Sequence, residues 1–234
     1  MSTAEPRVAL EPLASGQRMG RVEFHDRYEA MPPGTTFELI DGVVHMASPV
    51  GSNHGKRSFQ VTVWLGNYVW ETPRVEGLDN ASVALDDDNE VQPDLFLRVE
   101  SNRGGRSREL GNIIGGPPEL VVEVADSSRA IDLGAKRLAY ERAGCLEYVV
   151  FTSKPADVHW HARLDDRLIR VEPDHDGIYR SVAFPGLWLD PAAFLAKDVP
   201  AILEVLRRGL ASPEHAAFAA RLAAAANDPT GEIP

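Results

Sequence analysis

The sequence has a single cysteine, Cys145, and no apolar run that approaches the roughly 20 residues of a membrane-spanning helix. One cysteine cannot form a disulfide within the chain. The first twenty residues also lack an apolar core of signal-peptide length. We therefore expect a cytoplasmic protein without a membrane anchor.

Basic charge is scarce as well. Lysine and arginine together number 24, against 35 aspartates and glutamates, so the formal net charge is -11. A generic nucleic-acid binder presents a basic field, and any contact of this chain with nucleic acid must therefore be local. Arg103 and Arg106 belong to the densest basic stretch, around Gly104-Gly105. We expect them either to contact phosphates or to form a solvated loop.

The 234 residues, of which 44% are hydrophobic, suffice for one domain with tails. We expect a disordered tail over residues 1–20, a main domain over 21–190 and a C-terminal helical extension over 191–234. Periodicity predicts helices at 22–30, 53–70, 133–143, 199–209 and 213–226, with a short one from 191. It predicts strands at 35–40, 43–47, 75–78, 81–85, 91–97, 120–124, 147–151, 158–162, 167–171 and 179–184, and a polar loop at 101–118. This mixture predicts an α/β sheet with a helix on each side.

A tight hairpin is expected where Asp41-Gly42 separates the first two strands, because this dipeptide is a strong hairpin signal. Side chains alternate along a strand. Glu38 should therefore point to the face opposite Phe37 and Leu39.

Two carboxylates interrupt apolar strand-like runs, Asp94 in residues 92–97 and Glu123 in residues 119–124. An ionised carboxylate in a sheet core costs several kcal/mol unless a cation pairs with it. Mg²⁺ or Mn²⁺ fits this role because both favour hard oxygen ligands. The pattern predicts a metal site.

Lys136 begins the helix that follows the Glu123 strand, and Tyr140 lies four residues later on the same helix face. The lysine could stabilise charge on a phosphate near the metal, or it could be a surface lysine. Tyr140 could pack over the site or contact substrate.

Several runs together resemble the Uma-two family of restriction-endonuclease-like proteins, within the PD-(D/E)XK nuclease superfamily. The resemblance covers roughly residues 22–171. It rests on Phe37-Glu38-Leu39-Ile40-Asp41-Gly42, Gln92-Pro93-Asp94-Leu95, Leu120-Val121-Val122-Glu123-Val124, Asp132-Leu133-Gly134-Ala135-Lys136 with Tyr140, Ala143-Gly144 and Glu147-Tyr148. It implies a restriction-endonuclease-like α+β fold, with a mixed central sheet flanked by helices, an N-terminal hairpin and a C-terminal helical extension.

The resemblance also implies roles for single residues. Asp94 and Glu123 would bind Mg²⁺ or Mn²⁺, with Glu38 as a further ligand, and Lys136 would be the catalytic lysine. In the wider superfamily that lysine stands two residues after the strand acid, where this chain has Ala125. His54 matches a position that the family often fills with histidine and is a candidate for substrate binding.

The leading hypothesis is therefore a metal-dependent endonuclease that cleaves DNA. The alternatives are an inactive nuclease-like binding or assembly module and a metal-dependent hydrolase of a small phosphorylated substrate. We also expect a homodimer, since duplex cleavage needs two active sites, and the apolar faces of the C-terminal helices could supply the interface.

Overall fold

The computed structural model describes residues 11–224. Their central feature is a mixed six-stranded sheet in the order β12-β11-β10-β9-β6-β3, in which only β9 and β10 are parallel. Its strands are β3 (Val75–Asp79), β6 (Leu95–Val99), β9 (Leu120–Ala125), β10 (Glu147–Ser153), β11 (Ala156–Leu164) and β12 (Arg167–Val171). The mixed α+β class predicted from the sequence is confirmed.

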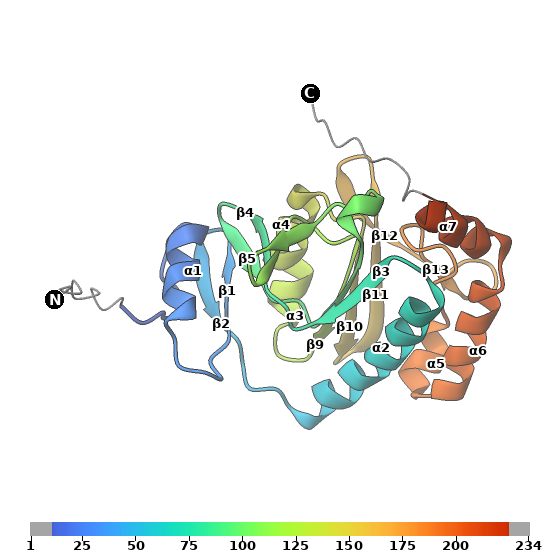
Figure 1. Ribbon diagram of the computed structural model, residues 1–234. Coiled ribbons are helices and arrows are strands. Elements are labelled where there is room, and N and C mark those ends of the chain that lie inside the picture. Colours follow the sequence, from blue (N-terminus) through green and yellow to red (C-terminus); the bar gives the residue numbers. More distant parts are fainter. Residues whose placement is uncertain (1–10, 225–234) are drawn as a thin grey trace.

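Helices cover both faces of this sheet (Figure 1). One face packs against α2 (Ser52–Glu71), α5 (Pro191–Ala196), α6 (Val199–Leu210) and α7 (Pro213–Ala224) in a core that includes Trp64, Trp160 and Phe194. The other face packs against α4 (Arg137–Ala143) around Phe96 and Tyr148. The short α3 (Arg129–Ile131) and the π-turn η2 (Asp132–Lys136) precede α4. No helix within residues 11–224 is both long and apolar enough to cross a membrane.

A second six-stranded sheet has the order β2-β1-β5-β4-β8-β7. Its strands are β1 (Phe37–Ile40), β2 (Val43–Met46), β4 (Val83–Asp86), β5 (Asn89–Val91), β7 (Arg108–Leu110) and β8 (Ile113–Gly115). The predicted continuous loop over 101–118 is therefore wrong: after the 3₁₀ turn η1 (Ser101–Arg103), it forms a hairpin whose β8 pairs with β4.

The predicted single strand over residues 91–97 is also wrong. Val91 ends β5 in one sheet and Leu95 begins β6 in the other. Pro93 lies between them and cannot donate a ladder hydrogen bond, which favours a break at this position. Asp94 thus lies at the junction of the two sheets rather than inside a strand.

The predicted hairpin is confirmed, with Asp41 and Gly42 both at positive φ between β1 and β2. Residues 11–20 pack against it, although the sequence predicts them as part of a disordered tail. Leu13 is buried, and Gly16 N–H donates to Val44 O at 2.8 Å. The helix α1 (Arg21–Glu29) follows (Figure 1). Residues 1–10, the rest of the predicted tail, lie outside the described part.

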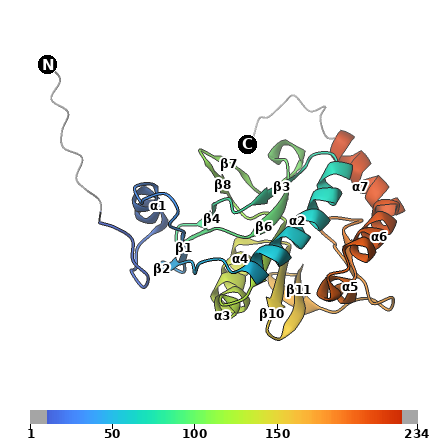
Figure 2. The ribbon, with the colours of Figure 1, turned by 90° about the horizontal axis from the view of Figure 1, so that it is seen from below.

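The C-terminal helices use their apolar faces within the chain. Ile202, Leu206, Phe218 and Leu222 belong to the same core as buried residues of α2. Figure 2 shows α6 and α7 beside α2. These faces are therefore not free to form the dimer interface expected from the sequence. Residues 179–184 do not extend the central sheet either, because β13 (Tyr179–Arg180) pairs with β14 (Trp188–Leu189). Residues 225–234 of the predicted extension lie outside the described part.

Candidate active site

A cleft of about 510 Å³ lies where the two sheets meet. It is lined by β1, the start of α2, the Gln92–Asp94 junction, the end of β9 and η2. All four residues singled out in the sequence, Glu38, Asp94, Glu123 and Lys136, contribute to its walls. Segments that are far apart in the sequence thus meet in one place.

Local structure directs each carboxylate into the cleft. Glu38 alternates with the buried Phe37 and Leu39 on β1, as predicted, and so faces away from their core. Glu123 lies in β9 and is only 3% exposed. Asp94 directly precedes β6, and its backbone N–H points to Glu123 Oε2 at 3.3 Å. The antiparallel pairing of β6 with β9, which sets Leu95 opposite Val122, therefore brings Asp94 next to Glu123.

Lys136 ends the π-turn and is only 3% exposed, so the surface-lysine alternative is wrong. Its Nζ lies 2.7 Å from Glu38 Oε1 and 2.9 Å from Glu123 Oε1. Glu38 Oε1 also accepts a hydrogen bond from Gln92 N–H at 2.7 Å. The ammonium group thereby links carboxylates that come from both sheets.

Asp94 is held by two contacts on its two oxygens. Its Oδ2 accepts the backbone N–H of Val124 at 2.7 Å, and its Oδ1 lies 3.2 Å from Nε2 of His54 in the first turn of α2. The hydrogen bond to Asp94 raises the pKa of His54 despite the opposing effect of burial. The structure thus places His54, predicted to bind substrate, beside a predicted metal ligand.

The pKa values of Glu123 and Lys136 are both raised, so each of these two groups holds its proton more tightly than it would in water. Burial raises the pKa of Glu123, and the nearby Asp132, Asp94 and Glu38 add to this, while Lys136 opposes it. Burial alone would lower the pKa of Lys136, but Glu123 and Glu38 outweigh it and the pKa is raised. Lys136 therefore remains an ammonium ion in a site with a surplus of acid groups.

Asp132 is a candidate that the sequence did not single out. It is 3% exposed and lines the cleft. Burial raises the pKa of its carboxyl group, and Lys136 offsets only part of this rise. The signal available was its position four residues before Lys136, which predicts a shared helix face. Its burial, however, comes from the π-turn, which periodicity does not predict.

Three other predicted contacts are corrected. Tyr140 is fully buried and does not line the cleft, so it packs behind the site instead of reaching substrate. Arg103 and Arg106 follow the far end of β6, whereas Asp94 precedes its near end. At about 3.3 Å per residue, the five residues of β6 separate them from the site by roughly 17 Å. Neither arginine lines the cleft.

The chemistry of the donors fits a hard divalent cation. Asp94, Glu123 and Glu38 present carboxylate oxygens, which Mg²⁺ and Mn²⁺ prefer. Glu123 Oε1 is buried and has no hydrogen-bond partner among the described residues. Its one close contact is the ion pair with Lys136 Nζ, at 2.9 Å. That oxygen keeps lone pairs available for a ligand.

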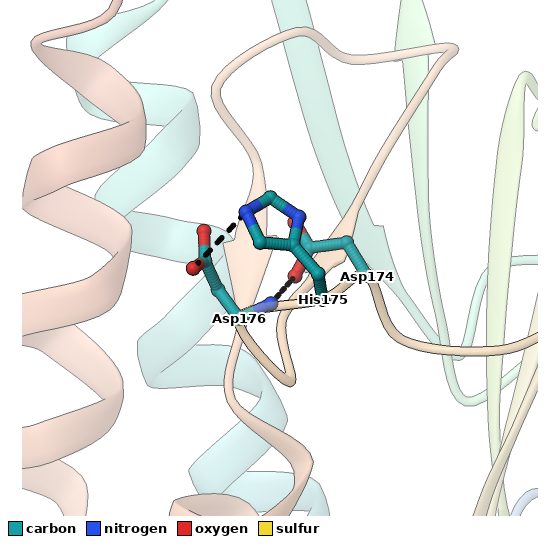
Figure 3. Close-up of side chains that lie close together, drawn as sticks. All are labelled: Asp174, His175 and Asp176. Atoms are coloured by element: carbon teal, nitrogen blue, oxygen red, sulfur yellow. Dashed lines mark hydrogen bonds and ion pairs between the residues drawn. The ribbon is translucent and has the colours of Figure 1, made fainter.

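A tighter set of potential ligands lies elsewhere. Among the described residues, Asp174, His175 and Asp176 are the one group of three whose ligand atoms lie within 4.8 Å of one another (Figure 3). All three follow one another in a partly exposed turn, and Arg180 already pairs with both aspartates. The cleft carboxylates are spread more widely because the Lys136 ammonium stands between Glu38 and Glu123.

Comparison with known proteins identifies a family and a solved structure of similar fold. The family model described as "Uma2: Putative restriction endonuclease" matches residues 22–192. A solved structure titled as a putative nuclease belonging to DUF820, from Anabaena variabilis, is similar with a TM-score of 0.55 and 13% sequence identity. The similarity covers 77% of this chain and 97% of the other, and it shows a common fold. No curated protein matches the sequence.

Proposed function

Since the chain belongs to the Uma2 family, whose description is that of a putative restriction endonuclease, we propose that it is a metal-dependent endonuclease that hydrolyses phosphodiester bonds in DNA. Family membership supports a nuclease-like function in general. The observation that carries the finer proposal is the meeting of Glu38, Asp94, Glu123 and the buried Lys136 in one cleft.

Each residue has a definite task in this proposal. Asp94 and Glu123 would hold Mg²⁺ or Mn²⁺, and Glu38 would be a further ligand or would bind the water. When bound there, the cation would supply charge neutralisation at the phosphate and activation of water. Lys136, kept protonated by its carboxylate neighbours, donates hydrogen bonds to the attacking water or to the charged phosphoryl oxygens. Val124 N–H and His54 fix the orientation of Asp94.

Cleavage of plasmid and single-stranded DNA in the presence of Mn²⁺ tests the activity. We expect wild type to convert both, and Asp94→Asn to reduce the rate by about 10²-fold or more, because loss of a metal ligand weakens transition-state charge stabilisation. Asp26→Asn is a matched control, since Asp26 is exposed on α1 and does not line the cleft. A wild-type protein that cleaves neither DNA nor small phosphodiesters would favour the inactive binding module.

Thermal unfolding tests the metal site independently of activity. Mg²⁺ or Mn²⁺ binds only the folded site, so it should raise the Tm of wild type. The rise should be smaller for Glu123→Gln, which keeps the shape of the side chain and removes the charge. Glu71→Gln, on the exposed end of α2, should behave as wild type. If metal does not raise the wild-type Tm, Asp94 and Glu123 are not metal ligands.

A second candidate function has its own support. Five acidic residues line the cleft, Glu38, Asp94, Glu123, Asp126 and Asp132, and Lys136 is the one lysine or arginine among its lining residues. Together with the net charge of -11, this favours a substrate that presents few phosphates. Metal-dependent hydrolysis of small phosphodiesters, with DNA left intact, would favour a hydrolase of a small phosphorylated compound.

A further inference from the structure

One edge of the central sheet ends on a strand with a free side. β3 is the last strand of the order and pairs with β6 alone among the described strands. Arg74 O accepts from Glu100 N–H at 3.0 Å, and Asn80 N–H donates to Asp94 O at 3.1 Å. The backbone N–H and C=O groups of residues 74, 76, 78 and 80 therefore point toward β6. Those of Val75, Gly77 and Asp79 point away from it, because the direction of these groups alternates along a strand.

The helix above this edge carries unpaired apolar surface. α2 packs on β3, as Figure 2 shows. Phe59, Thr62, Gly66 and Trp70 are spaced by three or four residues and so lie along one side of α2. Trp70 is 82% exposed and Phe59 is 71% exposed.

A groove runs between this side of α2 and the edge strand. It has a volume of about 280 Å³ and is lined by Thr62, Gly66, Trp70, Gly77 and neighbouring apolar residues. A Cβ atom added at Gly66 would meet nothing within 4 Å. The same helix therefore presents both a projecting aromatic side chain and an open space.

We propose that the β3 edge and this side of α2 form a two-fold interface with a second copy of the chain. An antiparallel pairing centred on Gly77 sets Val75 opposite Asp79 of the second copy, and Gly77 opposite Gly77. All of these residues point their backbone groups outward, so each facing pair exchanges two hydrogen bonds. The two-fold axis runs perpendicular to the sheet and leaves both α2 helices on the same face, where Trp70 of each copy reaches the groove of the other.

Charge is compatible with a second copy in this register. Glu76 faces Leu78 and Asp79 faces Val75, so no acidic residue opposes another acidic residue. Arg74, which is exposed although its Nη1 lies 3.4 Å from Glu100 Oε2 of its own chain, comes next to Asp79 and Asn80 of the other copy. Asn80 also lines the catalytic cleft, so the interface reaches the edge of each site and places the two clefts at opposite ends of the paired strands.

Measurement of molar mass over a concentration series tests the interface. We expect wild type to dimerise, and Gly66→Arg to weaken the dimer by at least tenfold, since the new side chain enters the space reserved for the partner. Gly66→Ala is the matched control and should dimerise like wild type. Neither change contacts the rest of its own chain at Cβ, so both variants should fold.

A charge exchange tests the register. Asp79→Arg should weaken the dimer several-fold, because the new arginine lies beside Arg74 of the other copy and the two positive charges repel. The double variant Arg74→Asp with Asp79→Arg should restore the dimer. A wild-type protein that is monomeric at every concentration would overturn the proposal. A dimer that tolerates Gly66→Arg would also overturn it, by assigning self-association to another surface.

Discussion

Replacement of Lys136 by methionine is expected to lower DNA cleavage by about 10²–10³-fold, the cost of losing one preorganised charge donor at the phosphate. The same change should enlarge the rise in Tm that Mg²⁺ produces. Lys136 is the ammonium group among four carboxylates, those of Glu38, Asp94, Glu123 and Asp132. Once it is removed, a divalent cation meets less repulsion and more unpaired negative charge.

The metal-free variant should be less stable than wild type by about 3 kcal/mol, because removal of one partner leaves buried carboxylates without their cation. This cost depends on pH. Lys136 lowers a Glu123 pKa that burial raises, so its loss raises that pKa further. A group with a raised folded-state pKa favours folding while it is protonated, and this contribution is lost as the pH rises through that pKa. The destabilisation should therefore be larger at alkaline than at acid pH.

Denaturant unfolding at two pH values, metal-dependent Tm shifts and cleavage rates together check this prediction. Lys154→Met is the control, because Lys154 is exposed and lies outside the cleft. A Lys136→Met variant that cuts DNA at the wild-type rate would remove Lys136 from the mechanism. A variant that loses both cleavage and the metal response would instead indicate that the whole site has collapsed.

The sequence predicts those residues of the site that interrupt an apolar pattern. Glu38, Asp94 and Glu123 stand out in this way, and the family resemblance favours a catalytic Lys136 over a surface lysine. Asp132 stands between the apolar Ile131 and Leu133, but at the start of an amphipathic helix such an aspartate is expected on the solvent face, and the burial found at the π-turn does not follow from that pattern. Sequence patterns report the surroundings of a residue along the chain, whereas the burial of Asp132 depends on a local irregularity.

Arg103 and Arg106 show a different limit. The sequence shows their density of positive charge and places them after the strand that contains Asp94, but it does not show whether the loop folds back toward the cleft. The structure places them at the opposite end of β6 from Asp94. The break at Pro93 could have been predicted from the sequence, because proline is disfavoured inside a central strand.

The C-terminal helices illustrate what amphipathicity leaves open. Their apolar sides were predicted correctly, but such a pattern does not specify what covers them, and the cover proves to be the chain's own core. Two glycines approach each other closely in this region. A Cβ atom at Gly209, in the last turn of α6, would lie 2.2 Å from Gly186 O and 2.8 Å from Trp188 Cγ.

Gly209→Ala is therefore expected to destabilise the protein by about 3 kcal/mol, at the upper end of typical overpacking costs, because one of the obstacles is backbone. For a domain of this size, that corresponds to a fall in Tm of roughly 6–12 °C. Alanine normally stabilises a helix relative to glycine by about 0.5–1 kcal/mol. A loss of stability on Gly209→Ala would therefore indicate the steric conflict. Gly55→Ala in α2 is the control, since its Cβ would meet nothing within 4 Å and its Tm should be unchanged or higher.

The same measurement decides whether residues 191–224 are an appendage or part of the main domain. α6 contributes Ile202 and Leu206 to the core that contains Trp64 of α2, and Trp64 Nε1–H donates to Trp188 O at 2.9 Å beside the glycine contact. Displacement of α6 should therefore loosen the whole sheet, and unfolding of Gly209→Ala should remain a single transition at lower temperature. Two separate transitions, with the main one at the wild-type Tm, would instead show that the C-terminal helices unfold on their own.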